Sequence, residues 1–250
     1  MIIDILTIFP SMVAGPITES IIGKAVTREL IDIRIINIRD YAVGSHRTTD
    51  DRPFGGGSGM IMKPEPLRAA IGDVRKNDPA ARVILLSPQG RLFDQAIALE
   101  LSRLSHICLV CGRYEGVDER IRNHYVDDEI SIGDYVLTGG ELPALVIVDA
   151  VARLLPGVLG SNESLTEESF ITGLLEYPHY TRPEIFENHR VPDILLSGNH
   201  GAIRRWRRQQ ALLRTWKRRP DLLEKNDLSL EDEELLAEAV STKEIRKVGN

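Results

Sequence analysis

The chain has 250 residues, of which 42% are hydrophobic and 27% are charged, and its 31 Lys and Arg residues against 37 Asp and Glu residues give a formal net charge of −6. This length fits one large domain, or one medium domain and a small one, and the composition excludes collagen-like, disulfide-scaffold and wholly disordered proteins. The acidic balance argues against a general nucleic-acid coat protein, because non-specific phosphate binding needs clustered positive charge.

Short apolar runs alternate with helical patterns through the first 160 residues. The almost continuous apolar character of four runs is typical of strands in a parallel sheet that is covered on both faces. These predicted strands are residues 2–9, 33–38, 82–87 and 107–111, and the predicted helices between them are residues 16–30, 64–76 and 94–105. The alternation predicts a doubly wound α/β domain, which binds its ligands in loops at the carboxyl ends of the strands.

Nothing near the start of the chain resembles a targeting segment. The first ten residues lack a basic leader and an apolar run, and the longest apolar stretch, residues 142–160, is shorter than the roughly 20 residues of a membrane span. We therefore expect a soluble, cytoplasmic protein. Cys108 and Cys111 form a C-x-x-C pattern, but residues three apart in a strand point to opposite faces, and zinc would need two further ligands. We interpret them as reduced core thiols.

The organisation of the chain changes after residue 160. Residues 161–172 are polar and lose the apolar periodicity, which predicts a flexible interdomain linker between a domain of residues 1–160 and a small all-helical domain of residues 173–250. Only helical patterns follow the linker. One of them ends before Pro220, and an acidic helix with capping-box spacing begins at Ser229.

Positive charge is concentrated in the first of these helical patterns. Between Gly201 and Pro220 there are eight basic residues and no acidic one, so removing them from the net charge of −6 leaves −14 on the other 230 residues. Solvated helix faces normally mix both signs, and arginine suits the geometry of phosphate, which favours nucleic-acid contact. The alternative is internal pairing with the acidic helix of residues 231–238. The eight residues are Arg204, Arg205, Arg207, Arg208, Arg214, Lys217, Arg218 and Arg219.

Three glycine-bearing segments follow one another at the predicted sheet edge. They are LSPQG (residues 86–90), GRYEG (112–116) and SIGDYVLTGGELP (131–143). Each alone is readily explained as a turn, but together they predict a backbone-lined pocket for a flat polar ligand such as an adenine nucleoside. The phosphate loop G-x-x-x-x-G-K-[ST] and the dinucleotide motif G-x-G-x-x-G are both missing, so any adenine cofactor is held in another way.

Two other segments have more than one reading. A fourth glycine cluster, DDRPFGGGSGM (residues 50–60), suits a flexible linker or a loop that closes over a substrate. The segment YPHYTRP (residues 177–183) combines aromatic rings, His179 and Arg182 between prolines, which is typical of elements that stack on bases and contact phosphates. Its position beside the arginine-rich helix favours that function over a plain loop.

Taken together, LSPQG, GRYEG, SIGDYVLTGGELP, DDRPFGGGSGM and PHYTRP resemble the bacterial tRNA (guanine-N1)-methyltransferase family of the SPOUT superfamily, from Met1 to about Trp216. The resemblance implies a deep trefoil knot in the α/β domain and a homodimer with active sites at the subunit interface. It also implies methyl transfer from S-adenosylmethionine to N1 of guanosine 37 of tRNA.

The resemblance also assigns residues. The catalytic arginine matches Arg153, and the general base, an aspartate in the family, matches Glu168, with Glu167 as a possible competitor; Ser58 replaces a family proline. Mg²⁺ dependence is implied, with Glu115 as the candidate ligand. From the basic stretch, residues 177–183, the glycine cluster and the linker, we expect RNA contact at Asp50, Arg52, Gly57, Ser169, His179, Arg182, Arg204, Arg205 and Arg208. The cofactor-binding residues are Leu86, Ser87, Pro88, Gln89, Gly90, Gly112, Tyr114, Glu115, Gly116, Ile132, Gly133, Asp134, Tyr135, Val136, Leu137, Gly139, Gly140 and Pro143.

The expected chemistry explains these roles. Guanine N1 carries a proton, so a carboxylate must accept it, and a cation is needed where negative charge develops on O6. The base must also leave the anticodon-loop stack. Two alternatives stay open: a non-catalytic tRNA-binding protein that keeps the fold, which would explain the departure at Glu168, and an enzyme that methylates a small molecule.

Overall fold

The computed structural model describes residues 1–159 and 168–248, with side chains up to residue 241. It divides into two compact units, Met1–Gly160 and Ser161–Asn250, and each is considered by itself. Within the described residues, no helix combines the length and the apolar character needed to cross a membrane.

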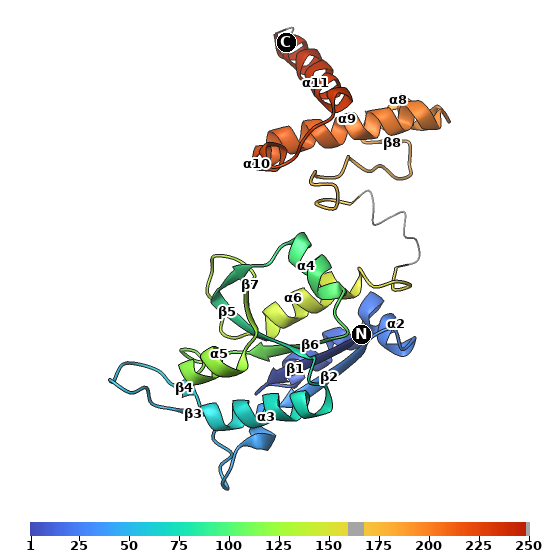
Figure 1. Ribbon diagram of the computed structural model, residues 1–250. Helices are drawn as coiled ribbons and strands as arrows, with labels where there is room; N and C mark the ends of the chain where they lie inside the picture. The colour runs from blue at the N-terminus through green and yellow to red at the C-terminus, as the bar shows by residue number, and fades with distance from the viewer. Residues whose placement is uncertain (160–167, 249–250) are drawn as a thin grey trace. The chain divides into compact units, whose positions relative to one another are not determined.

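A parallel five-stranded sheet forms the centre of the N-terminal unit, with strand order β2-β1-β6-β5-β7 (Figure 1). The predicted α/β class with a parallel sheet is confirmed. The sequence did not predict β7, because its four residues, Asp-Glu-Ile-Ser, contain one apolar side chain. The strand predicted to end at Ser87 continues to Leu92. The strands are β1 (Ile2–Thr7), β2 (Asp32–Asn37), β5 (Arg82–Leu92), β6 (His106–Cys111) and β7 (Asp128–Ser131).

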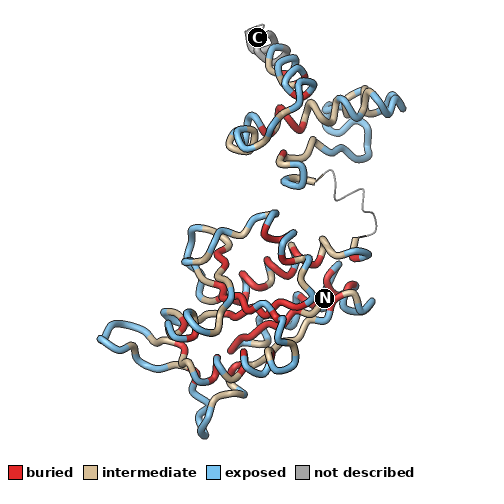
Figure 2. The backbone as a smooth tube through the Cα atoms, in the orientation of Figure 1, coloured by how far each residue is buried: buried red, intermediate tan, exposed pale blue. Residues whose placement is uncertain are grey.

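Helices cover both faces of this sheet (Figure 1). Alternate residues of β1 point to opposite faces, so that Ile5 packs in a core with α2, α4 and α6, whereas Leu6 packs in a core with α3 and α5. Figure 2 shows the strands as the most continuously buried part of the unit. The helical elements are α1 (Ser11–Ala14), η1 (Pro16–Thr18), α2 (Ser20–Thr27), η2 (Ile38–Tyr41), α3 (Pro64–Asn77), α4 (Gln95–Ser102), α5 (Glu119–Tyr125) and α6 (Glu141–Ala152).

Both cysteines lie in β6 and are fully buried free thiols. Cys108 belongs to the core beneath α3 and Cys111 to the core beneath α6, as the alternation of a strand requires. Burial raises the pKa of each thiol well above its ordinary value. The interpretation as core thiols is therefore confirmed.

The C-terminal unit is built around one long helix, α9 (His200–Arg218). Leu212 of α9 packs with Leu174 and with Leu235 of α11 in a small core. The expectation of helices alone after residue 172 is wrong in one respect, because two short strands pair as an antiparallel hairpin. The other elements are β8 (Ile185–Phe186), β9 (His189–Arg190), α8 (Asp193–Leu196), α10 (Pro220–Glu224) and α11 (Leu230–Val248).

Candidate active site

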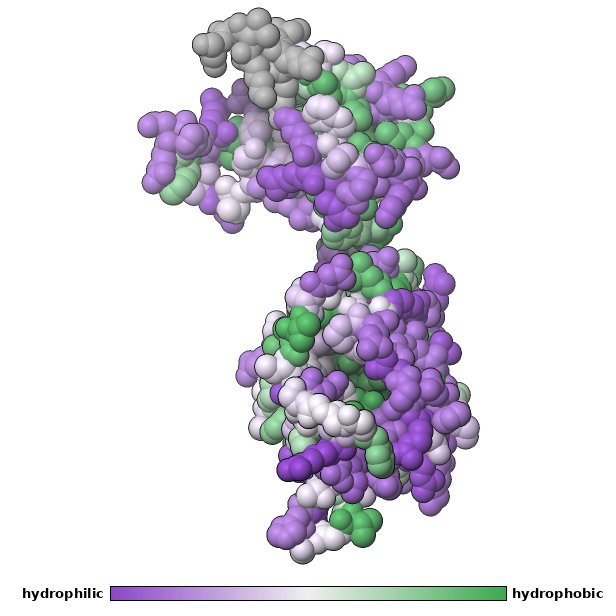
Figure 3. All heavy atoms as spheres, turned by 90° about the vertical axis from the view of Figure 1, so that its left-hand side faces the viewer, coloured by the Kyte–Doolittle hydropathy of each residue, from purple (hydrophilic) through white to green (hydrophobic). Residues whose placement is uncertain are grey.

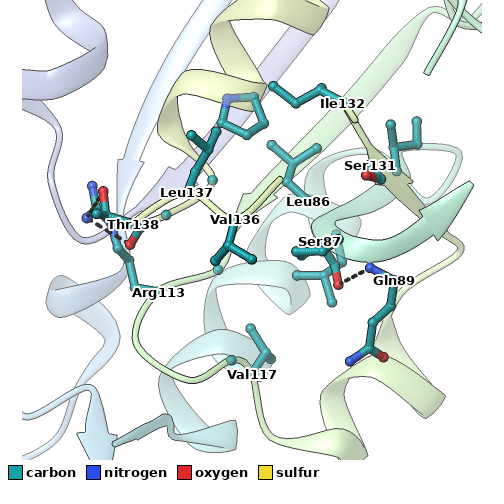
Figure 4. A pocket seen from close by; sticks show the side chains of 18 of the residues that line it. Leu86, Ser87, Gln89, Arg113, Val117, Ser131, Ile132, Val136, Leu137 and Thr138 are labelled. Carbon is teal, nitrogen blue, oxygen red and sulfur yellow. Dashed lines mark hydrogen bonds between the residues drawn. The ribbon is translucent and has the colours of Figure 1, made fainter. Parts of the chain in front are cut away.

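The three glycine-bearing loops line one cavity of about 260 Å³ at the carboxyl ends of β5, β6 and β7. Figure 4 shows the lining side chains Leu86, Val136 and Leu137 near the centre of the view and Gln89 at one side. Figure 3 views the molecule from the left-hand side of Figure 1, where the surface of the N-terminal unit is hollowed and hydrophobic side chains lie at the base of the hollow. All the expected cofactor-binding residues line the cavity except Gly90 and Asp134.

The first loop, residues 87–90, is an outward bulge of β5. The pairing between β5 and β7 shifts register between Leu86 and Arg91, so the residues between them leave the ladder. Gly90 does not line the cavity because it packs against β7, where a Cβ would lie 2.4 Å from the carbonyl carbon of Glu129. The glycine allows this close approach and holds the loop beside its neighbour strand.

The second loop, residues 112–116, contacts the fourth glycine cluster. Tyr114 has a positive φ of 60°, and the N–H of Glu115 donates to the carbonyl of Met60 at 3.0 Å. A Cβ on Gly59 would lie 2.4 Å from the Glu115 side chain. Residues 50–62 form a hairpin between β3 (Asp50–Asp51) and β4 (Ile61–Met62). The glycine cluster therefore lies against the second loop, one wall of the cavity.

The third loop lies directly on the second. The N–H of Gly140 donates to the carbonyl of Gly112 at 2.9 Å. Beneath it, the fully buried carboxylate of Glu141 accepts hydrogen bonds from Thr7 Oγ1 at 2.6 Å and from Arg113 Nε at 2.9 Å. Arg113 also donates to the carbonyl of Thr138 at 3.1 Å. This network joins the second and third loops to the first strand, which keeps the cavity walls in register.

The C-terminal unit has a separate cavity of about 790 Å³. The Arg207 guanidinium lies 4.7 Å from the centre of the Tyr177 ring, and the ring of His179 lies 4.7 Å from that of Tyr177. Arg182 and Arg204 line the same cavity. Cationic and aromatic side chains of residues 177–183 and of α9 therefore converge on one surface, as the sequence led us to expect.

Two of the predicted RNA-binding arginines are engaged by the acidic helix α11. Arg208 forms two hydrogen bonds to Asp232, at 2.7 and 2.8 Å, and Arg205 lies 3.2 Å from the carboxylate of Glu238. The Arg208 guanidinium holds the pKa of Asp232 below its ordinary value. Internal pairing, the alternative left open by the sequence, thus accounts for part of the basic stretch.

Comparison with known proteins identifies the family. The family model described as tRNA (Guanine-1)-methyltransferase TrmD matches residues 1–225. The chain belongs to the tRNA (guanine-1)-methyltransferase family. It is 60% identical over 245 residues to the tRNA (guanine-N(1)-)-methyltransferase of Dictyoglomus turgidum, with 98% of both chains covered. It is 59% identical over 240 residues to that of Moorella thermoacetica, with 95% of this chain and 96% of the relative covered.

Three residues that the sequence singled out lie outside the cavity lining: Arg153, Glu168 and Ser169. Arg153 immediately follows α6 in the N-terminal unit and is partly buried. Glu168 and Ser169 open the described part of the C-terminal unit and are also partly buried, while the competing Glu167 lies outside the described residues. The three predicted RNA-binding residues of the glycine cluster are also described. Asp50 lies opposite Met62 in the β3–β4 ladder, Arg52 is exposed, and Gly57 has a φ of 121°.

The sequence did not single out several residues that line the methyltransferase cavity. Arg113, Ser131 and Thr138 lie within the glycine-bearing motifs, so the motifs themselves were a signal for them. Arg122 lies on α5, between the second and third loops, and belongs to no motif, so the sequence offered no signal for it. The additional lining residues are Leu85, Arg113, Val117, Arg122, Ile130, Ser131 and Thr138.

Proposed function

We propose that this protein transfers a methyl group from S-adenosylmethionine to N1 of guanosine 37 of tRNA. The observation that carries the proposal is the convergence of the three glycine-bearing loops on one cavity, in a chain that the methyltransferase family matches over residues 1–225. The names of the relatives describe enzymes, and nothing in the comparisons supports a non-catalytic tRNA-binding protein.

The cavity suits the adenosine part of the cofactor. Leu86, Ile132 and Leu137 supply apolar contact area for a purine, while Gln89 and the glycine backbone supply polar groups for a sugar. When bound, the cofactor supplies a sulfonium-activated methyl group. A Rossmann-type phosphate loop is not needed, because this ligand carries no phosphate.

The protein's own groups handle the proton and the developing charge. Glu168 accepts the proton from guanine N1, which makes N1 nucleophilic, and its carboxylate lies one methylene further from the backbone than the family aspartate. Arg153 stabilises the negative charge that develops on O6. Glu115, which faces the cavity, is our candidate for a Mg²⁺ contact, although no cluster of three or more potential metal ligands occurs among residues 1–159 and 168–241.

We further propose the homodimer with interfacial active sites. One exposed stripe of α6 carries Leu142 and Val146, which are 52% and 45% exposed, followed by Asp149 and, just beyond the helix, Arg153. Apolar side chains on this stripe favour contact with a second subunit. The proposed catalytic arginine would then lie beside the interface.

The finer fold assignments belong to the same proposal. The family resemblance implies a trefoil knot in the N-terminal unit, and we retain it as part of the proposal; the third loop lies against the end of β6, where a Cβ on Gly140 would lie 2.6 Å from Cys111 Cα. Residues 1–160 would hold the cofactor, and residues 161–172 would link them to a mainly helical tRNA-binding domain of residues 173–250. A tRNA substrate would be consistent with the expected cytoplasmic location.

The tRNA surface would include the glycine cluster and the cavity of the C-terminal unit. Asp50, Arg52 and Gly57 come from the first, and Ser169, His179 and Arg182 come from the segments that precede α8. Arg204 is exposed and lines the C-terminal cavity, so it is well placed to contact phosphate. Arg205 and Arg208 would have to exchange their carboxylate partners for phosphate.

The decisive experiment compares two tRNA transcripts that differ only in guanosine or adenosine at position 37. Incubation with methyl-labelled S-adenosylmethionine should label the guanosine transcript alone, and nucleoside analysis should recover the label as 1-methylguanosine. Equal labelling of both transcripts would reject the target. Absence of labelling, with tRNA still bound, would favour the binding protein.

A further inference from the structure

One cationic side chain lines the cavity although it belongs to none of its three loops. Arg122 projects from α5, and its side chain is only 15% exposed. Burial of a guanidinium to this degree is unusual unless the group has partners. Its partners therefore indicate what it does.

Arg122 connects α5 to the first loop and to β7. Its Nη1 donates to Oε1 of Gln89 and lies 3.5 Å from Oε2 of Glu129, and its Nε lies 3.4 Å from Oε2 of Glu119. The guanidinium thus lies within ion-pair distance of two carboxylates, although its buried Nε and Oε2 of Glu129 form no hydrogen bond among the described residues. Because its charge is already compensated locally, Arg122 is poorly suited to attract an anionic group of a ligand by itself.

The contact with Gln89 determines which way the carboxamide points. A guanidinium has only donors, so it must face the oxygen of the amide and not its nitrogen. Nε2 of Gln89 is then turned away from Arg122, and it forms no hydrogen bond with any residue in the described parts of the chain. Gln89 lines the cavity, so two N–H donors remain for a bound molecule.

We propose that Arg122 is a positioning residue for the cofactor site: it orients Gln89 so that Nε2 donates to an acceptor oxygen of the bound nucleoside. This inference rests on the proposed function. The acceptor belongs either to the ribose hydroxyls or to the amino-acid carboxylate of S-adenosylmethionine, both of which accept hydrogen bonds.

The test measures binding of S-adenosylhomocysteine, a stable product with the same ribose and carboxylate, by calorimetry on the full chain. Arg122→Met keeps the length and apolar stem but removes the donor, and the expected loss is about three- to tenfold in Kd, the effect of one hydrogen bond. Arg120→Met is the matched control on the same helix. Arg120 pairs with Asp118 at 2.7 Å and does not line the cavity. The Arg120→Met variant should therefore bind S-adenosylhomocysteine with a Kd within twofold of that of the unaltered protein.

A double-substitution cycle separates positioning from general loosening of the structure. If Arg122 acts through Gln89, Arg122→Met should weaken binding no further once Gln89→Ala is present. Arg122→Lys retains a donor and should recover part of the loss. Repeating the measurement with 5′-methylthioadenosine, which lacks the carboxylate, locates the acceptor: a persisting effect assigns the ribose, and a vanished effect assigns the carboxylate.

Three results would contradict the proposal. Unchanged binding by Arg122→Met would show that the amide needs no orientation. Additive losses in the double variant would show that Arg122 acts independently of Gln89. Failure of the unaltered protein to bind S-adenosylhomocysteine would overturn the proposed function as well, which distinguishes the two failures.

Discussion

The close contact of the third loop with the end of β6 makes Gly140 the most informative single position for a test. Its φ of −82° is ordinary for any residue, so Gly140→Ala introduces no backbone strain. The effect of the substitution comes from space alone. The added methyl carbon would lie 2.6 Å from Cys111 Cα and 3.0 Å from the backbone nitrogen of Gly112.

Neither neighbour of Gly140 can move aside, because both are backbone atoms at the end of the buried strand β6. Ordinary contact begins at 3.4 Å, so the third loop must shift by about 0.8 Å from the 2.6 Å position. Overpacking of this kind costs about 1–3 kcal/mol. A displacement of about 1 Å in a wall of the cavity is expected to lower kcat/KM by about a hundredfold.

The assay combines calorimetric binding of S-adenosylhomocysteine, steady-state methyl transfer and thermal unfolding of each variant. Gly72→Ala is the matched control, because Gly72 is exposed on α3 and a Cβ there meets nothing within 4 Å. That variant should be as active as the parent and more stable by about 0.5–1 kcal/mol, since alanine favours helix. Cofactor binding by Gly140→Ala within twofold of the parent, with unchanged unfolding, would refute the argument.

Three further predictions concern the proposed base and the basic helix. Glu168→Gln should lower turnover at least a hundredfold while tRNA affinity changes little, because only the proton acceptor is lost; retained turnover would point to another base. The slope of log affinity for tRNA against log salt concentration reports the ions released on binding, and Arg204→Gln should lower it by about one ion more than Arg205→Gln does, because Arg205 is already paired with Glu238. Equal slopes for the two variants would contradict this. Because Arg208 lowers the pKa of Asp232, their pair stabilises the fold above pH 4 and this contribution is lost as the pH falls through the lowered pKa. Asp232→Asn should therefore lower the unfolding free energy by about 1 kcal/mol at pH 7, with a smaller difference from the parent in urea titrations at pH 3.

Local pattern was sufficient to predict the strands that lie inside the sheet. β1, β5 and β6 each contain a mostly apolar run, because parallel strands covered on both faces bury side chains on both sides. The edge strand β7 escaped prediction because its neighbours, and not its own composition, hold it in the sheet. The hairpin of β8 and β9 was missed for a similar reason, since two residues per strand carry no period.

The motifs predicted the loops of the cavity, but not the contacts that shape it. A glycine in a sequence shows only that close approach is possible, whereas Gly90 turns out to pack on β7 and Gly140 on the second loop. Arg122 comes from a helix that carries no motif, so only folding brings it to Gln89.

The sequence by itself determined the family, the alternation of strands and helices, and the separation of an acidic body from a basic stretch. It left open whether the basic residues serve nucleic acid or internal pairing, because charge along a chain does not show which face of a helix each side chain occupies. The tertiary structure shows which of these residues pair internally. The packing of α11 on α9 places carboxylates against Arg205 and Arg208, whereas Arg204 faces the cavity of the C-terminal unit.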